Sequence, residues 1–174
     1  MVLNIQKTKS SFFMQNENQL FIFTDGSVNT KTNIGWGAFL VVPDIELQVE
    51  KLKQSVKLKR FEDTSSSRLE IQTLIWALSE VLNFNGKITV YTDSQTIVGL
   101  AGRRFRLEKN NYHSKSGRLI NNYDLYREFF AITDQINCEF IKIKGHKQSV
   151  RKDKTDNIFA LVDRAARNAV RGEK

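Results

Sequence analysis

The sequence has one cysteine, no long apolar run and no low-complexity segment, and each absence excludes a class of protein. Cys138 has no second cysteine with which to form a disulfide, which favours a reducing compartment. The longest apolar runs, such as FLVV at 39–42, are far shorter than the roughly 20 residues of a membrane span. The first residues lack the charged start and apolar core of a signal peptide. We therefore expect a cytoplasmic protein that does not bind a membrane.

The composition is that of a single globular domain with a basic surface. At 174 residues the chain is long enough for one sizeable hydrophobic core, and 40% hydrophobic with 26% charged residues is typical of globular proteins. We expect one domain over residues 1–174, with its core over about 20–170, and a monomer. The net charge of +8 favours a polyanionic partner such as nucleic acid, although solubilising charge is the ordinary alternative.

Hydrophobic periodicity predicts the order βββαβα, a basic insert, then αβα, with the first three strands in an antiparallel meander. In chain order, the predicted strands cover 19–25, 34–42, 45–60, 87–92 and 138–144. The predicted helices cover 65–84, a short segment after Asp93, a segment from near Asn122, and 154–172. The insert at about 102–118 has six Arg or Lys residues against one Glu. We interpret it as an exposed protrusion that holds phosphates without reading sequence.

Three carboxylates lie at the ends of predicted elements, and each also has an ordinary structural explanation. Asp25 ends the first strand, where an Asp-Gly turn is the alternative. Glu70 fits a capping box with Ser67, but it lies on the apolar side of its helix, so its carboxylate points toward the sheet. Asp93 fits an N-cap, but it follows a strand at the carboxyl edge, where α/β folds generally bind ligands.

The last predicted helix offers two further carboxylates on one stripe. Asp156 and Asp163 are seven residues apart, which is two helical turns. Asp163 can pair with Arg167 at i+4, and Asp156 in the first turn interacts favourably with the helix dipole. Helical spacing alone does not choose between them.

Five motifs, in this order, resemble those of the type 1 ribonuclease H domain, both the free-standing bacterial enzyme and the domain attached to retroviral reverse transcriptases. They are TDGS at 24–27, SSSRLE at 65–70, YTDSQ at 91–95, KGH at 144–146 and DRAAR at 163–167. The resemblance covers about residues 20–170. It implies an α/β, ribonuclease H-like fold with a five-stranded mixed sheet, three antiparallel then two parallel strands, flanked by helices.

The same resemblance implies endonucleolytic cleavage of the RNA strand of an RNA/DNA hybrid with two Mg²⁺ or Mn²⁺ ions. The residues that match the family's four metal-binding carboxylates are Asp25, Glu70, Asp93 and Asp163. His146 matches a histidine thought to assist proton transfer or product release. The interval from His146 to Asp163 is longer than in typical members, and a ten-residue interval would select Asp156 instead.

The chemistry explains why acidic residues would gather in one cleft. Phosphodiester hydrolysis needs an activated water and a stabilised leaving oxygen, and two hard cations about 3.5 to 4 Å apart provide both. Carboxylate oxygens are natural ligands of Mg²⁺, whereas several carboxylates crowded together without a cation repel one another. We therefore interpret Asp25 as a ligand rather than a turn residue.

Candidate substrate contacts surround these acids, although each of them is also an ordinary cap, turn or loop residue. Gly26 leaves the backbone bare enough to approach a ribose 2′-OH, the group that distinguishes RNA from DNA. The bacterial enzymes are usually rich in asparagine before RLE, whereas this chain has two serines. The full set of candidate contacts is Gly26, Ser27, Asn29, Ser66, Ser67, Arg68, Gln95, Arg103 and Arg104.

Two other functions are compatible with a ribonuclease H-like sequence. One is a DNA-directed nuclease such as an integrase, a resolvase or a 3′-to-5′ exonuclease, but the D-x-E typical of such exonucleases is absent because Ser27 follows Asp25 at that spacing. The other is an inactive module that binds hybrid or RNA. All four acidic positions are filled, which a binding module does not need.

Overall fold

The computed structural model describes residues 18–144 and 153–173. Its strands are β1 (Gln19–Asn29), β2 (Ile34–Val42), β3 (Lys57–Phe61), β4 (Lys87–Thr92) and β5 (Asn137–Lys142). Its helices are α1 (Val49–Leu52), the short 3₁₀ turn η1 (Lys53–Ser55), α2 (Ser66–Ser79), α3 (Gln95–Val98), α4 (Leu100–Lys109), α5 (Tyr123–Thr133) and α6 (Lys154–Gly172). No helix in these two ranges is both long and apolar enough to cross a membrane.

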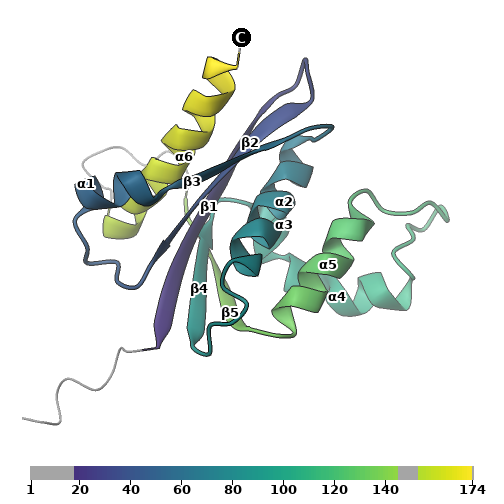
Figure 1. The fold of residues 1–174 in the computed structure, drawn as a ribbon. Helices are drawn as coiled ribbons and strands as arrows, with labels where there is room; N and C mark the ends of the chain where they lie inside the picture. Colours follow the sequence, from purple (N-terminus) through teal and green to yellow (C-terminus); the bar gives the residue numbers. More distant parts are fainter. Residues whose placement is uncertain (1–17, 145–152, 174) are drawn as a thin grey trace, which may run out of the picture.

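Within the described residues, the strands form one five-stranded sheet in the order β3-β2-β1-β4-β5 (Figure 1). β1, β2 and β3 pair antiparallel, whereas β4 pairs parallel to β1 and β5 pairs parallel to β4. The parallel pairs are joined through helices, as crossover connections require. The predicted mixed sheet flanked by helices is therefore confirmed.

Three predicted strands differ from the observed ones, the last of them only slightly, because β5 covers Asn137–Lys142 rather than 138–144. β1 does not end at Asp25, because its antiparallel ladder with β2 continues to Asn29, opposite Ile34. The predicted strand over 45–60 is wrong in its first part, because α1 and η1 precede β3. The alternating apolar residues there do not form one buried strand face: Ile45 and Val49 pack partly buried against the core, but Leu47 is 42% exposed, and Leu52 in α1 is buried.

Helices cover both faces of the sheet, and each face has its own core. On one face, α6 packs across β1 and β2; on the other face, α2 packs on the same two strands and is covered by α5 (Figure 1). The α6 side buries Phe23, Leu40, Ile158 and Val162. The α2 side buries Ile22, Phe39, Leu74 and Phe129. Each such side chain contributes about 1.5–3 kcal/mol by leaving water, so both helices are held firmly against the strands that carry the site.

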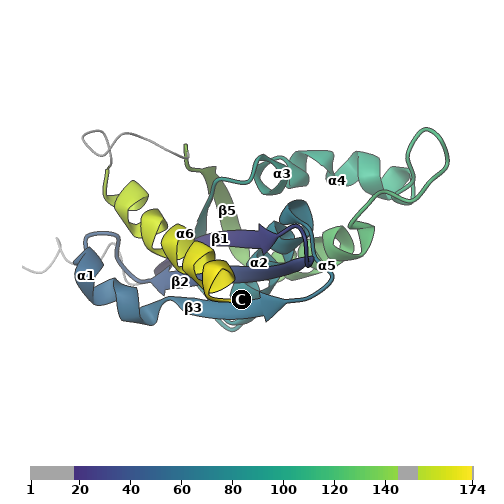
Figure 2. The ribbon, with the colours of Figure 1, turned by 90° about the horizontal axis from the view of Figure 1, so that it is seen from above.

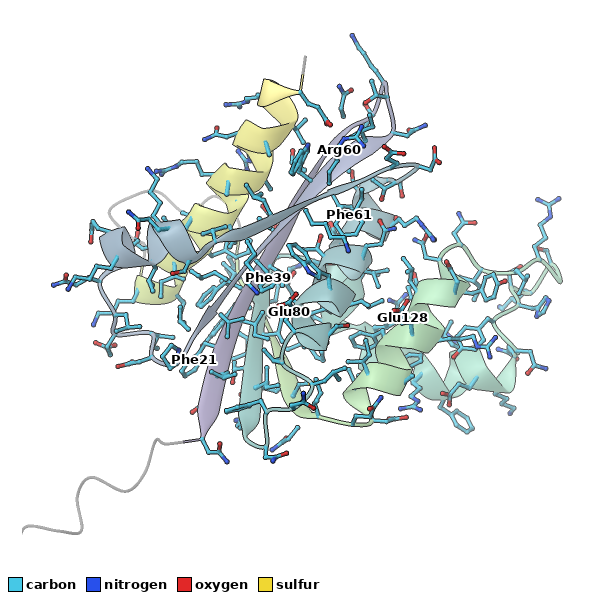
Figure 3. The ribbon with its side chains drawn as sticks, viewed as in Figure 1. Phe21, Phe39, Arg60, Phe61, Glu80 and Glu128 are labelled. Carbon is cyan, nitrogen blue, oxygen red and sulfur yellow. The ribbon has the colours of Figure 1, made fainter. Side chains whose placement is uncertain are left out.

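Figure 3 labels residues that show how these layers are tied together. Phe39 of β2 lies under α2, where its ring meets the edge of Trp76 at a centroid distance of 4.5 Å. Arg60 of β3 lies near the last turn of α6 and pairs there with Glu173. The indole N–H of Trp36 donates to the same carboxylate at 3.0 Å. The end of α6 is thus anchored to both β2 and β3.

Glycines let α2 approach the sheet closely. A Cβ on Gly26 would lie 2.8 Å from Cδ2 of Leu69, and a Cβ on Gly37 would lie 2.1 Å from the hydroxyl of Thr73. Gly26 and Gly37 are paired across β1 and β2, so both lie under the same stretch of α2. Because any larger residue would push the helix outward, these glycines set the depth of Glu70 relative to Asp25.

The basic insert is partly helical, which its sequence pattern did not predict. Residues 100–109 form α4, whose only buried side chains are Leu100 and Leu107, seven residues apart. So few apolar positions do not give a clear helical pattern. Seen from above in Figure 2, α4 and the loop after it extend away from the sheet.

Candidate active site

Asp25 and Asp93 lie just beyond the point where the parallel pairing of β1 with β4 ends. The parallel ladder between these strands ends with Phe23 opposite Tyr91, while β1 continues along β2. β4 ends at Thr92, and Asp93 is the next residue. The two carboxylates therefore meet at the carboxyl edge of β4, the edge at which open α/β sheets bind ligands.

Asp25 is the most strongly perturbed carboxyl of the site. Burial, together with the negative charges of Asp93 and Asp163, raises the pKa of Asp25 to about 8, and the backbone N–H of Gly26 opposes this rise. The Asp25 and Asp163 side chains also share a hydrogen bond. A carboxyl in this setting is stabilised as an anion only when a positive charge arrives.

Glu70 of α2 joins the cluster through Ser94. The Ser94 hydroxyl donates to Oε2 of Glu70 at 2.5 Å and accepts from the backbone N–H of Ile97, so it also caps α3. Burial raises the pKa of Glu70; the Ser94 hydrogen bond lowers it, and the charge of Asp93 raises it further. Ser94 thus fixes the Glu70 carboxylate beside Asp93.

The structure distinguishes the two acids of α6. Asp163 lies near the middle of the helix, contacts Asp25 and pairs with Arg167 at 2.6 Å. Asp156 lies in the first turn, is 6% exposed and forms a reciprocal capping box with Asp153. Asp156 therefore stabilises the start of the helix, whereas Asp163 faces the other acids.

The ordinary explanations for three of the acids do not hold in the structure. Asp25 is in no turn, because it pairs with Ala38 inside β1. Glu70 is in no capping box, because Ser65 caps α2 and accepts from the backbone N–H of Arg68. Asp93 is not the N-cap of α3, a position that Ser94 occupies. No turn, capping box or N-cap therefore explains the positions of these three acids.

The donor set suits a hard divalent cation. In residues 18–144 and 153–173, no three His, Cys, Asp or Glu side chains form a ready-made cage for one ion, and the acids are linked pairwise. Mg²⁺ commonly binds through one or two carboxylates, with waters and substrate phosphates completing its shell. Paired oxygen donors that repel in the absence of a cation fit that mode of binding.

The neutral candidate contacts lie in β1 and at the start of α2. Gly26 and Ser27 are in β1, and Asn29 ends that strand and accepts from the backbone N–H of Lys31. Ser66 and Ser67 are exposed in the first turn of α2. The tight contact between Gly26 and Leu69 gives Gly26 a packing role whether or not it also approaches a ribose.

The cationic candidates make specific contacts within the protein. Arg68 pairs with Asp124 at 2.7 Å. Arg103 donates to the backbone carbonyls of Thr96 and Gly99. Arg104 donates to both carboxylate oxygens of Asp134, with the NH2–Oδ2 distance 2.9 Å, and pairs with Glu108.

Gln95 and His146 complete the candidate set. The Gln95 side-chain oxygen accepts from Nζ of Lys142 at 2.6 Å. His146 lies outside the described residues. Ser94 was not predicted from the sequence, although its position three residues before the first buried residue of α3 was a signal. The acids that pair with the arginines were also missed: Asp124 and Asp134 have no sequence signal, whereas Glu108 lies at the i+4 spacing of a helical ion pair from Arg104.

Known proteins resemble this chain in sequence over most of its length. The family model RNase H matches residues 17–171. The chain is 29% identical over 157 residues to a ribonuclease H of Caldicellulosiruptor saccharolyticus, covering 88% of this chain and 97% of that protein. It is 28% identical over 143 residues to a ribonuclease H of Moorella thermoacetica, covering 80% and 88% of the two chains.

Solved structures share the fold. The PFV RNase H domain, solved in solution, superposes with a TM-score of 0.71 at 18% identity, over 88% of this chain and 94% of that one. A foamy viral protease-reverse transcriptase in complex with RNA/DNA hybrid superposes with a TM-score of 0.70 at 12% identity, over 98% of this chain and 22% of that one. With the family model spanning nearly the whole sequence, the chain belongs to the RNase H family.

Proposed function

We propose that this protein is an endoribonuclease that hydrolyses the RNA strand of RNA/DNA hybrids with two divalent metal ions. The observation that carries the proposal is the contact of Asp25 with Asp163 and its electrostatic interaction with Asp93, at the carboxyl edge of β4. Crowded acids reduce the stability of the free protein, so their presence favours a function that supplies cations.

Four carboxylates would hold the ions, and they come from three separate parts of the fold. Asp25 in β1 and Asp93 directly after β4 come from the sheet, Glu70 comes from α2 and Asp163 from α6. When bound, the metals activate water and neutralise charge on the leaving oxygen. Ser94 holds Glu70 in place by its 2.5 Å hydrogen bond. Since Asp156 is engaged in the capping box, its position supports Asp163 as the fourth carboxylate.

The rest of the surface supports a nucleic-acid substrate. The net charge is +8, and several of the Arg and Lys residues lie in α4 and the loop after it, which extend away from the sheet. The name ribonuclease H of the relatives supports a hybrid substrate, and the solved foamy viral protease-reverse transcriptase is in complex with RNA/DNA hybrid in one structure and with dsDNA in another. The 2′-OH is the group through which such a site distinguishes the RNA strand.

Gel-resolved cleavage of a labelled RNA/DNA hybrid tests the proposal. We expect the RNA strand to be cut with Mg²⁺ or Mn²⁺, no cutting in EDTA, and no cutting of single-stranded RNA, duplex RNA or duplex DNA. Asp93→Asn should bind the hybrid as the wild type does but not cut it. Binding without cutting by the wild type would favour the inactive module, and cutting of DNA would favour a DNA-directed nuclease.

A further inference from the structure

Lys142 is a cation at the same edge of the sheet as the acids, and no motif includes it. It is the last residue of β5 and pairs with Thr92, the last residue of β4. The next residue in the chain, Ile143, donates its backbone N–H to the Thr92 carbonyl at 2.8 Å. Adjacent strands lie about 4.8 Å apart, so the backbone of Lys142 runs directly beside the strand end that carries Asp93.

The side chain of Lys142 is held toward the site. Its Nζ donates to the side-chain oxygen of Gln95 at 2.6 Å, at the start of α3. Within the described part of the chain, Lys142 makes no ion pair with a carboxylate. The residue is exposed, so its remaining ammonium protons are free for another acceptor.

A charge that only protects an edge strand from pairing is the ordinary alternative. The lysines of β3, at the opposite edge of the sheet, illustrate that role. Lys57 pairs with Glu80 at 2.7 Å, and Lys59 lies over the rings of Phe61 and Trp76. These lysines are occupied by contacts within the protein, whereas Lys142 is tethered by a neutral amide and keeps its charge uncompensated.

We propose that Lys142 binds a backbone phosphate of the nucleic-acid duplex that is bound at the acidic site, with Gln95 positioning its ammonium group. The proposal rests on the proposed function, because it takes the hybrid as the ligand. Lys142 lies on β5, which is separated from β1 by β4 and contacts α3, the helix that leads into the basic insert. It therefore adds a positive charge beside the strand end that carries Asp93, on the same side as the basic insert, and a lysine binds phosphate as a point charge.

Fluorescence anisotropy with a labelled hybrid in EDTA, where no cutting depletes the ligand, tests the proposal over a range of salt concentrations. Lys142→Ala should weaken binding several-fold and reduce the slope of log K against log salt by about one. Lys142→Arg should retain most of the affinity, since it keeps the charge. Lys59→Ala is the matched control, because it removes one exposed edge-strand lysine and should change neither quantity.

The two proposals fail in different ways. If the wild type neither binds nor cuts hybrid, the proposed function is wrong. If the wild type binds and cuts but Lys142→Ala keeps its affinity and salt slope, only the role of Lys142 is wrong. Equal losses in Lys142→Ala and Lys59→Ala would also overturn it, because the effect would then be one of net charge alone.

Discussion

The charges of the acidic site and those of the basic insert are compensated to different degrees in the free protein. In the acidic site, like charges are brought together and partly buried, so that the pKa of Asp25 rises to about 8. In the insert, Arg104 is compensated inside the protein by Asp134 and Glu108, while Arg103 donates to two backbone carbonyls. Among the described residues, the outer cations Arg106 and Lys109 have no carboxylate partner.

The difference shows which charges await a ligand. A cluster of like charges without counter-charges is unfavourable in the free protein and becomes favourable when a ligand of opposite charge binds. A side chain that already has an ion-pair partner mainly holds two elements together. On this view, the four carboxylates and the outer cations are the binding groups, while Arg104 fixes α4 to α5. Removing members of each class should therefore have separable effects on activity and stability.

The largest effect should separate the two acids of α6. Asp163→Ala should reduce cleavage about 100-fold or more, because a lost metal ligand removes several kcal/mol of transition-state stabilisation. Its melting temperature should not fall, since the change removes a charge facing Asp25 along with a weak surface ion pair to Arg167.

Asp156→Ala is the matched variant on the same helix. It should lose the capping box and about 0.5–2 kcal/mol of stability, while cleavage at low temperature stays near the wild-type rate. Thermal unfolding and single-turnover cleavage of both variants check this. The reverse pattern, with Asp156→Ala inactive and stable, would make Asp156 the fourth carboxylate.

A second prediction concerns the cost of the crowded acids without metal. The ordinary pKa of Asp25 is 3.8, and its folded value is about 8. Between these values the folded state binds more protons than the unfolded state, so the stability of the metal-free protein should fall as pH rises from about 4 to 8. Asp25→Asn removes this titration.

The variant should therefore be more stable than the wild type in EDTA above pH 8, by on the order of 2 kcal/mol or roughly 4–8 °C in melting temperature. At pH 4 the two proteins should melt together. Excess Mg²⁺ should stabilise only the wild type, which provides the control. If the wild type and Asp25→Asn lost the same stability as pH rises, Asp25 would not be the group that causes the pH dependence.

Much of the fold was predictable because its patterns are local. The strands at 34–42 and 87–92 and the helix at 154–172 have the predicted bounds, since each combines a clear apolar period with turn or cap residues at its ends. The end of β1 was missed because the Asp-Gly pair resembles a turn. Its extension to Asn29 depends on pairing with β2, which local sequence does not encode.

The acidic positions were predictable from motifs, but the partners of the arginines were not. Arg68 meets Asp124 from 56 residues away, and Arg104 meets Asp134 from 30 residues away. Such pairs form only when α2, α4 and α5 pack together. The number of charges along the sequence does not show which arginine of the insert will have a partner in the folded protein. The sequence-based prediction that Arg104 contacts substrate therefore competes with a structural role.

The smallest expected effect is in the basic insert, where it distinguishes a structural role of Arg104 from a role in substrate binding. Arg104→Ala removes the bidentate pair with Asp134 and the guanidinium over the Phe130 ring at 4.9 Å. Because the pair is exposed to solvent, we expect only a small loss of stability, with little change in hybrid affinity. Arg106→Ala combined with Lys109→Ala should leave the melting temperature unchanged.

The double variant should instead weaken hybrid binding and lower the salt slope by up to about two, because each cation would neutralise one phosphate. Thermal unfolding and salt-dependent anisotropy of both proteins give the comparison. If Arg104→Ala lowered the slope of log K against log salt and left the melting temperature unchanged, Arg104 would be a substrate-binding residue. That result would also show that an ion pair in the free protein can exchange its carboxylate for a phosphate when the hybrid binds, as two charged partners of similar geometry allow.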